Sequence, residues 1–160
     1  MNKYIALLRG INVGGHRKVP MADLKKMMES LGFLKIITLL NSGNIIFESN
    51  SETEQNLEKN IDDNLEKTFG FPVPVLVRTG QDLLKMKEAD LFSEINETND
   101  TRLYVSFIKC SPAHTPGLPF ETEDKSFRIL SESGRAVFSV LDLSLSGSIK
   151  AMEQLEKIYG

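Results

Sequence analysis

The sequence contains one cysteine, two histidines and no tryptophan among its 160 residues. A single cysteine, Cys110, excludes an intramolecular disulfide and any metal site built on a cysteine pair. His16 and His114 fall in separate predicted loops without a carboxylate cluster, so no metal site is predicted. No apolar run approaches a membrane span, and the apolar stretch of MNKYIALLRG is too short for a signal peptide. These absences predict a cytoplasmic protein with no membrane partner.

The net charge of the whole chain is small, but two segments of the chain carry a larger net charge of opposite sign. The net charge is −3, yet residues 1–50 carry seven Lys and Arg against three Asp and Glu, a net charge of +4. Residues 51–100 carry five against twelve, a net charge of −7. The first fifty residues therefore present a basic patch, or the helices of the two segments simply have differently charged solvent faces.

Hydrophobic periodicity predicts the order β-α-β-β-α-β over residues 3–79, the ferredoxin-like or split βαβ pattern. Strands are expected at 3–10, at 73–79 and in a hairpin over 35–49 that turns at Ser42-Gly43. Helices are expected over 20–32 and over 51–70, the second with a capping box of Ser51 and Glu54. Apolar residues at helical spacing predict the core faces of these two helices: Leu24, Met27, Met28, Leu31; Leu57, Ile61, Leu65, Phe69.

The second half of the chain resembles an incomplete copy of the first. Residues 80–100 are predicted as a helical connector, followed by a strand at 102–109, a proline-rich loop at 110–124, a hairpin at 126–142 and a last helix at 148–160. The stretches NSGNIIF and ESGRAVF occupy equivalent places in the two hairpins. We interpret residues 101–160 as a degenerate second ferredoxin-like subdomain after a first one at 1–79. Two unrelated hairpins sharing a common turn are the alternative. The apolar face of the last helix is expected to be Ile149, Met152, Leu155 and Tyr159.

The stretch RGINVGGHRK, residues 9–18, is the densest cluster of glycines and cations. Gly10 and Gly15 have the spacing of a P-loop, but His16 and Arg17 stand where its Lys and Ser or Thr belong. Asn12 occupies the middle glycine of a dinucleotide-binding turn. Nucleoside triphosphate hydrolysis and dinucleotide binding are therefore excluded, and no cofactor is predicted.

A weaker interpretation of this loop survives. Its glycines allow N–H groups to form a nest for an anion, and the loop leads into a helix N-terminus at Pro20. In a β-α-β-β-α-β unit the end of the first strand and the start of the third lie at the same edge of the sheet. The candidate ligand-binding residues are therefore Arg9, Asn12, Gly14, Gly15, His16, Arg17, Lys18, Ser42 and Asn44. The alternatives are that the glycines only permit a tight connection, and that Asn12 and Asn44 only tie down backbone groups.

Catalysis and nucleic-acid binding have little support in the sequence. His16 is either a general base near bound substrate or simply a solvated loop histidine. Cys110 lacks a partner that would activate it, and no Ser, His and Asp set is apparent. An RNA-recognition motif needs aromatic residues on its sheet face, and only Tyr4 and Phe47 are available. No catalytic residue is assigned, and nucleic acid is not a predicted partner.

The stretch YIALLRGINVGGHRKVPMADL followed by SGNIIF resembles the bacterial family catalogued as domain of unknown function 1697. The resemblance extends from Tyr4 to about Ser146 and includes GFPVPVLVRT. It implies an α+β fold with ferredoxin-like repeats, and it implies no activity or catalytic residue. Family members usually continue past the last helix with an Arg-Asn-Trp-like stretch, which this sequence lacks.

The sequence thus predicts an α+β protein that binds a small phosphate- or carboxylate-bearing ligand at the 9–18 loop. Whether a reaction follows binding stays open. The alternative is a protein-protein interaction or dimerisation module, forming a homodimer through an exposed sheet edge or face without catalysis.

Overall fold

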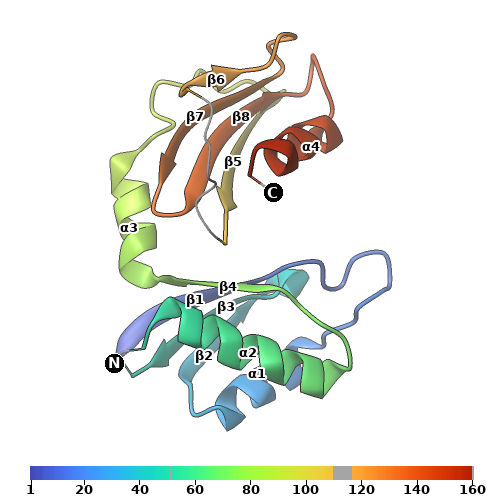
Figure 1. The fold of residues 1–160 in the computed structure, drawn as a ribbon, viewed down its shortest axis with the longest axis vertical. Helices are drawn as coiled ribbons and strands as arrows, with labels where there is room; N and C mark the ends of the chain where they lie inside the picture. Colours follow the sequence, from blue (N-terminus) through green and yellow to red (C-terminus); the bar gives the residue numbers. More distant parts are fainter. Residues whose placement is uncertain (51, 110–116, 160) are drawn as a thin grey trace. The chain divides into compact units, whose positions relative to one another are not determined.

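The computed structural model describes residues 1–50, 52–109 and 117–159 of the chain. The chain divides into two compact units, Met1–Leu84 and Lys85–Gly160. In the described residues, each unit contains one four-stranded antiparallel sheet, and four α-helices accompany the two sheets (Figure 1). The fold is therefore mixed α+β, as predicted. The predictions for Ser51, Cys110 and His114 concern residues outside the described ones.

The first unit has the predicted element order. Its elements are β1 (Asn2–Leu8), α1 (Met21–Ser30), β2 (Leu34–Leu39), the 3₁₀ turn η1 (Leu40–Ser42), β3 (Asn44–Ser49), α2 (Glu54–Phe69) and β4 (Val75–Thr79). The strand order across the sheet is β2-β3-β1-β4, with every neighbouring pair antiparallel. The end of β1 and the start of β3 are therefore neighbours, and Leu7 pairs with Asn44.

One face of this sheet forms the core under α1 and α2 (Figure 1). Alternate residues of β1, Tyr4, Ala6 and Leu8, point into that core because side chains of a strand alternate between its faces. The Phe47 ring lies 5.7 Å from the Tyr4 ring and 4.7 Å from the Phe33 ring, centroid to centroid. The predicted helical faces are confirmed, since these helix residues pack in the same core: Leu24, Met27, Met28, Leu31; Leu57, Ile61, Leu65, Phe69.

The N-terminus of α2 differs from the prediction. Its N-cap is Thr53, whose hydroxyl accepts a hydrogen bond from the Asn56 N–H at 3.2 Å. With Thr53 as the N-cap, Glu54 is the first helical residue, and the N3 position that a capping box uses is occupied by Asn56. The Glu54 carboxylate accepts from the Thr79 N–H of β4 at 3.1 Å.

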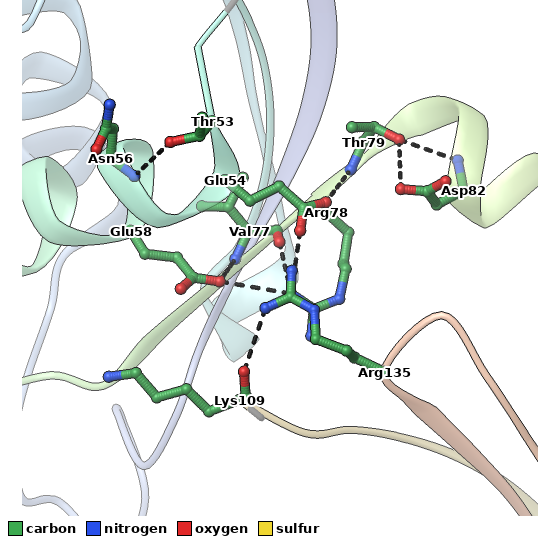
Figure 2. Close-up of polar contacts among 10 residues, drawn as sticks. All are labelled: Thr53, Glu54, Asn56, Glu58, Val77, Arg78, Thr79, Asp82, Lys109 and Arg135. Carbon is green, nitrogen blue, oxygen red and sulfur yellow. Dashed lines mark hydrogen bonds and ion pairs between the residues drawn. The ribbon is translucent and has the colours of Figure 1, made fainter. Parts of the chain in front are cut away.

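The outer edge of β4 is closed by carboxylates of α2 (Figure 2). Glu58 accepts from the Val77 N–H at 2.9 Å, and its Oε1 lies 3.4 Å from Arg78 Nη1. Arg78 Nη1 also lies 3.9 Å from Glu54 Oε2 and donates to the Val77 carbonyl at 2.6 Å. The Arg78 side chain is only 1% exposed. Glu54 and Glu58 thus satisfy N–H groups that an edge strand would otherwise present to another chain.

The second unit is built on a sheet with the strand order β5-β8-β7-β6. Its elements are β5 (Thr101–Phe107), β6 (Phe120–Glu121), β7 (Phe127–Ser133), β8 (Ala136–Asp142) and α4 (Ser148–Tyr159), while α3 (Gly80–Ala89) crosses the boundary between the units. The hairpin predicted at 126–142 is present as β7 and β8. The segment predicted as a loop at 110–124 contains the short strand β6, which pairs with β7 and which the prolines concealed.

The buried face of α4 was predicted incorrectly in part. Ala151 and Leu155 are buried in the second core, and Tyr159 packs against it. Ile149 is 78% exposed and Met152 37% exposed. The sheet beneath α4 selects a stripe centred on Ala151 and Leu155, which differ by one helical turn, and a small alanine carries no strong periodicity signal.

Two ionisable groups of the second unit have shifted pKa values. Hydrogen bonds from Lys150, Ser126 and Thr122 hold the pKa of Asp124 well below its ordinary value. Burial, with a hydrogen bond to the Glu132 carboxylate, raises the pKa of Tyr159 above its ordinary value. Lys150 joins α4 to Asp124 in the β6–β7 connection at 2.6 Å, and Tyr159 joins α4 to Glu132 of β7.

Candidate functional site

The glycine loop that follows β1 is a miniature hairpin. The Asn12 N–H donates to the Arg17 carbonyl and the His16 N–H donates to the Val13 carbonyl, each at 3.1 Å. Gly14 and Gly15 form the turn with φ values of 59° and 78°. Two successive left-handed residues are what a type I′ hairpin turn requires, and glycine adopts that conformation without strain. The glycines therefore form this turn, and the Asn12 and His16 N–H groups are bonded within the loop. The anion nest at this loop stays a prediction.

Asn12 fixes the loop to its surroundings. Its Oδ1 accepts from the Val19 N–H at 2.9 Å, and its Nδ2 donates to the carbonyls of Val19 at 3.1 Å and Asn41 at 3.0 Å. The first two bonds close the loop on itself, and the third joins it to η1. The Asn12 carboxamide thus has a positioning role, which is the alternative that the sequence left open for it.

The loop and η1 border an open depression with a volume of about 340 Å³. The residues that line it are Asn12, Gly15, Lys18, Val19, Pro20 and Asn41. The 3.0 Å contact between Asn12 and Asn41 brings the two segments together at the sheet edge where the strand topology places them.

Several predicted ligand-binding residues do not line the depression. The Ser42 hydroxyl donates to the Leu39 carbonyl at 3.0 Å, and Asn44 is half-buried in β3 opposite Leu7. Four further predicted residues are exposed but are not among the lining residues: Arg9, Gly14, His16 and Arg17. The sequence predicted which loop and which turn contribute to the candidate site. The hairpin geometry determines which of their side chains line the depression.

Lys18 is the charged side chain of the lining, and Pro20 connects the lining to α1. Lys18 is exposed, so its ammonium remains hydrated and available to a ligand. Pro20 is the N-cap of α1 and offers no side-chain cap to its first N–H groups. The depression therefore combines one cation with the positive end of a helix dipole. Among the residues that the structure describes, no three His, Cys, Asp or Glu side chains gather as a metal site requires.

Two features were missed in the sequence. Asn41 was not among the predicted ligand-binding residues, although it belongs to the same turn at the sheet edge as Ser42 and Asn44. The carboxylates that close β4 were also missed. Their signal was an arginine, Arg78, within an otherwise apolar strand, together with Glu54 and Glu58 one turn apart on a helix.

No helix in the described part of the chain has the length and apolar character needed to cross a membrane. No curated protein matches the chain. Among solved structures, the conserved bacterial protein SP0830 from Streptococcus pneumoniae is similar in fold, with a TM-score of 0.65 and 22% sequence identity. The match covers 99% of this chain and 82% of that chain. The model of the family described as protein of unknown function (DUF1697) matches residues 1–138. The chain therefore belongs to the DUF1697 family, as its sequence indicated.

Proposed function

We propose that the protein binds a small phosphate- or carboxylate-bearing ligand in the depression between the glycine loop and η1. The observation that carries this proposal is the position of Lys18 in the lining of a depression. The Asn12 carboxamide holds its frame by donating two hydrogen bonds and accepting one. A frame that is fixed before binding lowers the entropy lost when a ligand is ordered.

The surrounding charge supports the same ligand class. Arg9, His16 and Arg17 are exposed on the same loop, and residues 1–50 carry a net charge of +4. Exposed cations attract an anion through water, and salt screens that attraction over about 10 Å at 0.1 M. Binding is therefore expected to be weak for inorganic phosphate and to decrease as ionic strength rises.

A thermal-shift titration with phosphate and with citrate at constant ionic strength tests the proposal. A ligand at about a hundred times its dissociation constant adds about 2.7 kcal/mol of stability, which is a shift of several degrees. Lys18→Gln is expected to abolish most of the shift, because it removes the charge from the lining and keeps a side chain of similar length.

Lys25→Gln is the matched control, since Lys25 is an exposed lysine on α1 and is not among the lining residues. Equal shifts for both variants would mean that the anions act through the net charge of the unit. No shift for the parent protein with either anion would contradict the proposal outright.

We also propose that the first unit is a ferredoxin-like subdomain and that the second is a rearranged copy of it. The strand series β5-β8-β7 corresponds to β1-β3-β2 of the first sheet, and α4 follows β8 as α2 follows β3. In this alignment a loop with β6 replaces the first helix, and the fourth strand has no counterpart among the described residues. The proposed boundaries stay at 1–79, 80–100 and 101–160, and the proposed location stays cytoplasmic because of the single cysteine.

A further inference from the structure

We infer that the anion bound at the glycine loop is the carboxylate of an acidic polypeptide segment, and that an aliphatic side chain of this segment packs on Val13 and Leu40. The inference rests on the proposed function and specifies the ligand class of the same site. It turns the depression into part of a docking surface, defined here as Val13, Arg17, Lys18, Leu40 and Asn41.

Two exposed aliphatic residues are next in sequence to residues that line the depression. Val13 is 69% exposed and Leu40 is 85% exposed. Val13 follows Asn12 in the sequence, and Leu40 precedes Asn41. The Asn12 Nδ2 lies 3.0 Å from the Asn41 carbonyl oxygen. Isolated exposed aliphatic residues are ordinary, but two that neighbour the hydrogen-bonded Asn12 and Asn41 are, in this inference, the apolar rim of the depression. A free phosphate or citrate ion gains nothing from such a rim.

The backbone holds Leu40 in an unfavourable conformation. Its φ is 55°, in the left-handed region that asparagine and glycine tolerate and that a bulky side chain disfavours. The neighbouring position holds Asn41, whose residue type would suit a positive φ better. Leu40 is thus neither buried in the folded chain nor suited to the backbone conformation at its position. Its contribution is expected to come on binding, where its side chain loses water.

The charge and chemistry of the surface favour a polypeptide as the occupant. The exposed cations Arg9, Arg17 and Lys18 complement a run of carboxylates. An open depression leaves much of a bound anion exposed, and an extended peptide that carries the anion adds contacts outside the depression through a side-chain anchor. Residues 9–20 and 39–43 contain no Phe, Tyr or Trp, and the single His16 is a small stacking surface, which disfavours single-stranded nucleic acid.

A titration of the whole ¹⁵N-labelled chain with designed peptides tests the inference. The probe is acetyl-Gly-Asp-Glu-Leu-Asp-Glu-Gly-amide, and its two controls replace Leu with Ser or replace the four acids with Asn and Gln. We expect the leucine peptide to bind about tenfold more tightly than the serine peptide. The free energy gained by burying a leucine side chain exceeds the free energy that corresponds to a tenfold difference in affinity. The uncharged peptide is expected not to bind, and amide shifts should centre on residues 12–20 and 39–43.

Leu40→Asn separates binding from folding. Asparagine tolerates the positive φ, so the variant is expected to unfold at a temperature about 2–4 °C higher than the parent. It is also expected to lose the tenfold preference for leucine over serine while keeping its response to phosphate. Ile149→Asn is the matched control, since Ile149 is 78% exposed on α4 of the second unit, and it should keep the preference.

The outcomes are distinct. A serine peptide that binds as tightly as the leucine peptide, with phosphate binding intact, overturns this inference and leaves the proposed function standing. Absence of binding by phosphate, citrate and all peptides overturns both. Tighter, Leu40-dependent binding of an oligothymidylate or of phosphatidylserine vesicles overturns the choice of a polypeptide.

Discussion

At the scale of single residues, asparagine and glycine at positive φ shape the candidate site. Asn12 adopts a φ of 56°, and its carboxamide makes three hydrogen bonds with the backbone of its own loop and of η1. Gly43, with a φ of 78°, lies under that loop, and a Cβ placed on it would be 2.5 Å from Ile11 Cδ1 and 3.0 Å from Leu8 Cβ. Ile11 is buried, so the loop packs directly on the turn because that position has no side chain.

Gly43→Ala is therefore expected to destabilise the protein by about 2–4 kcal/mol, from the left-handed strain and from overpacking against Ile11. Urea unfolding of the parent and the variant measures the loss. Gly70→Ala is the control, because Gly70 has a φ of 79° but no atom within 4 Å of the added Cβ, and it should cost only about 1 kcal/mol. Equal losses for the two variants would show that the close packing of the loop contributes nothing.

At the scale of elements, the two edges of the first sheet are closed to strand addition in different ways. The β4 edge has its N–H groups bound by Glu54 and Glu58. The β2 edge is irregular between Leu34 and Ile37, and Lys35 adopts a φ of 49° with its ammonium 3.0 Å from the Glu48 carboxylate. A bulge and a lysine both discourage pairing with another chain. These features disfavour strand addition at the two edges, and dimerisation through a sheet edge or face stays a prediction.

Glu58→Leu is expected to cost about 3–5 kcal/mol, because it leaves the buried Val77 N–H without its acceptor and Arg78 with one carboxylate fewer. Glu58→Gln should cost less, since its amide oxygen still accepts from Val77. Denaturant unfolding gives both values.

A double-mutant cycle with Arg78→Leu isolates the contribution of the pair, and the double variant should recover part of the loss. Strictly additive losses would show that Glu58 and Arg78 do not interact in stabilising β4.

At the scale of the whole molecule, the chain builds two hydrophobic cores that share no residue. The first core uses residues between Tyr4 and Val77, and the second uses residues between Tyr104 and Tyr159. Helix α3, which crosses the boundary, buries no residue of its own, and Thr79 caps its start through two hydrogen bonds with Asp82. Each unit thus has the apolar interior that a domain needs to fold by itself.

A fragment of residues 1–84 is accordingly expected to fold alone and to unfold cooperatively, within a few degrees of the corresponding transition of the whole chain. Circular dichroism at 222 nm and urea unfolding are the measurements. A fragment that lacks a cooperative transition would show that the first core depends on the second unit. The same fragment contains the whole candidate site, so it should also retain the phosphate response of the parent.

By itself, the sequence determined the features that depend on local periodicity and turn chemistry. The order β-α-β-β-α-β, the core faces of α1 and α2, the second hairpin and the family all follow from patterns within short stretches. These patterns are reliable because 3.6-residue and two-residue repeats report directly on a buried face.

Only the tertiary structure decided which polar groups meet. Asn12 holds the loop in place because Val19 and Asn41 lie within reach of its carboxamide, and its contact with a ligand stays a prediction. The predicted capping box is wrong because α2 starts at Glu54, whose carboxylate bonds to the backbone of a strand distant in sequence. Ile149 and Met152 face solvent because α4 lies on its sheet along Ala151 and Leu155. A hydrogen bond depends on position within a few tenths of an ångström, and only the packed chain determines position so finely.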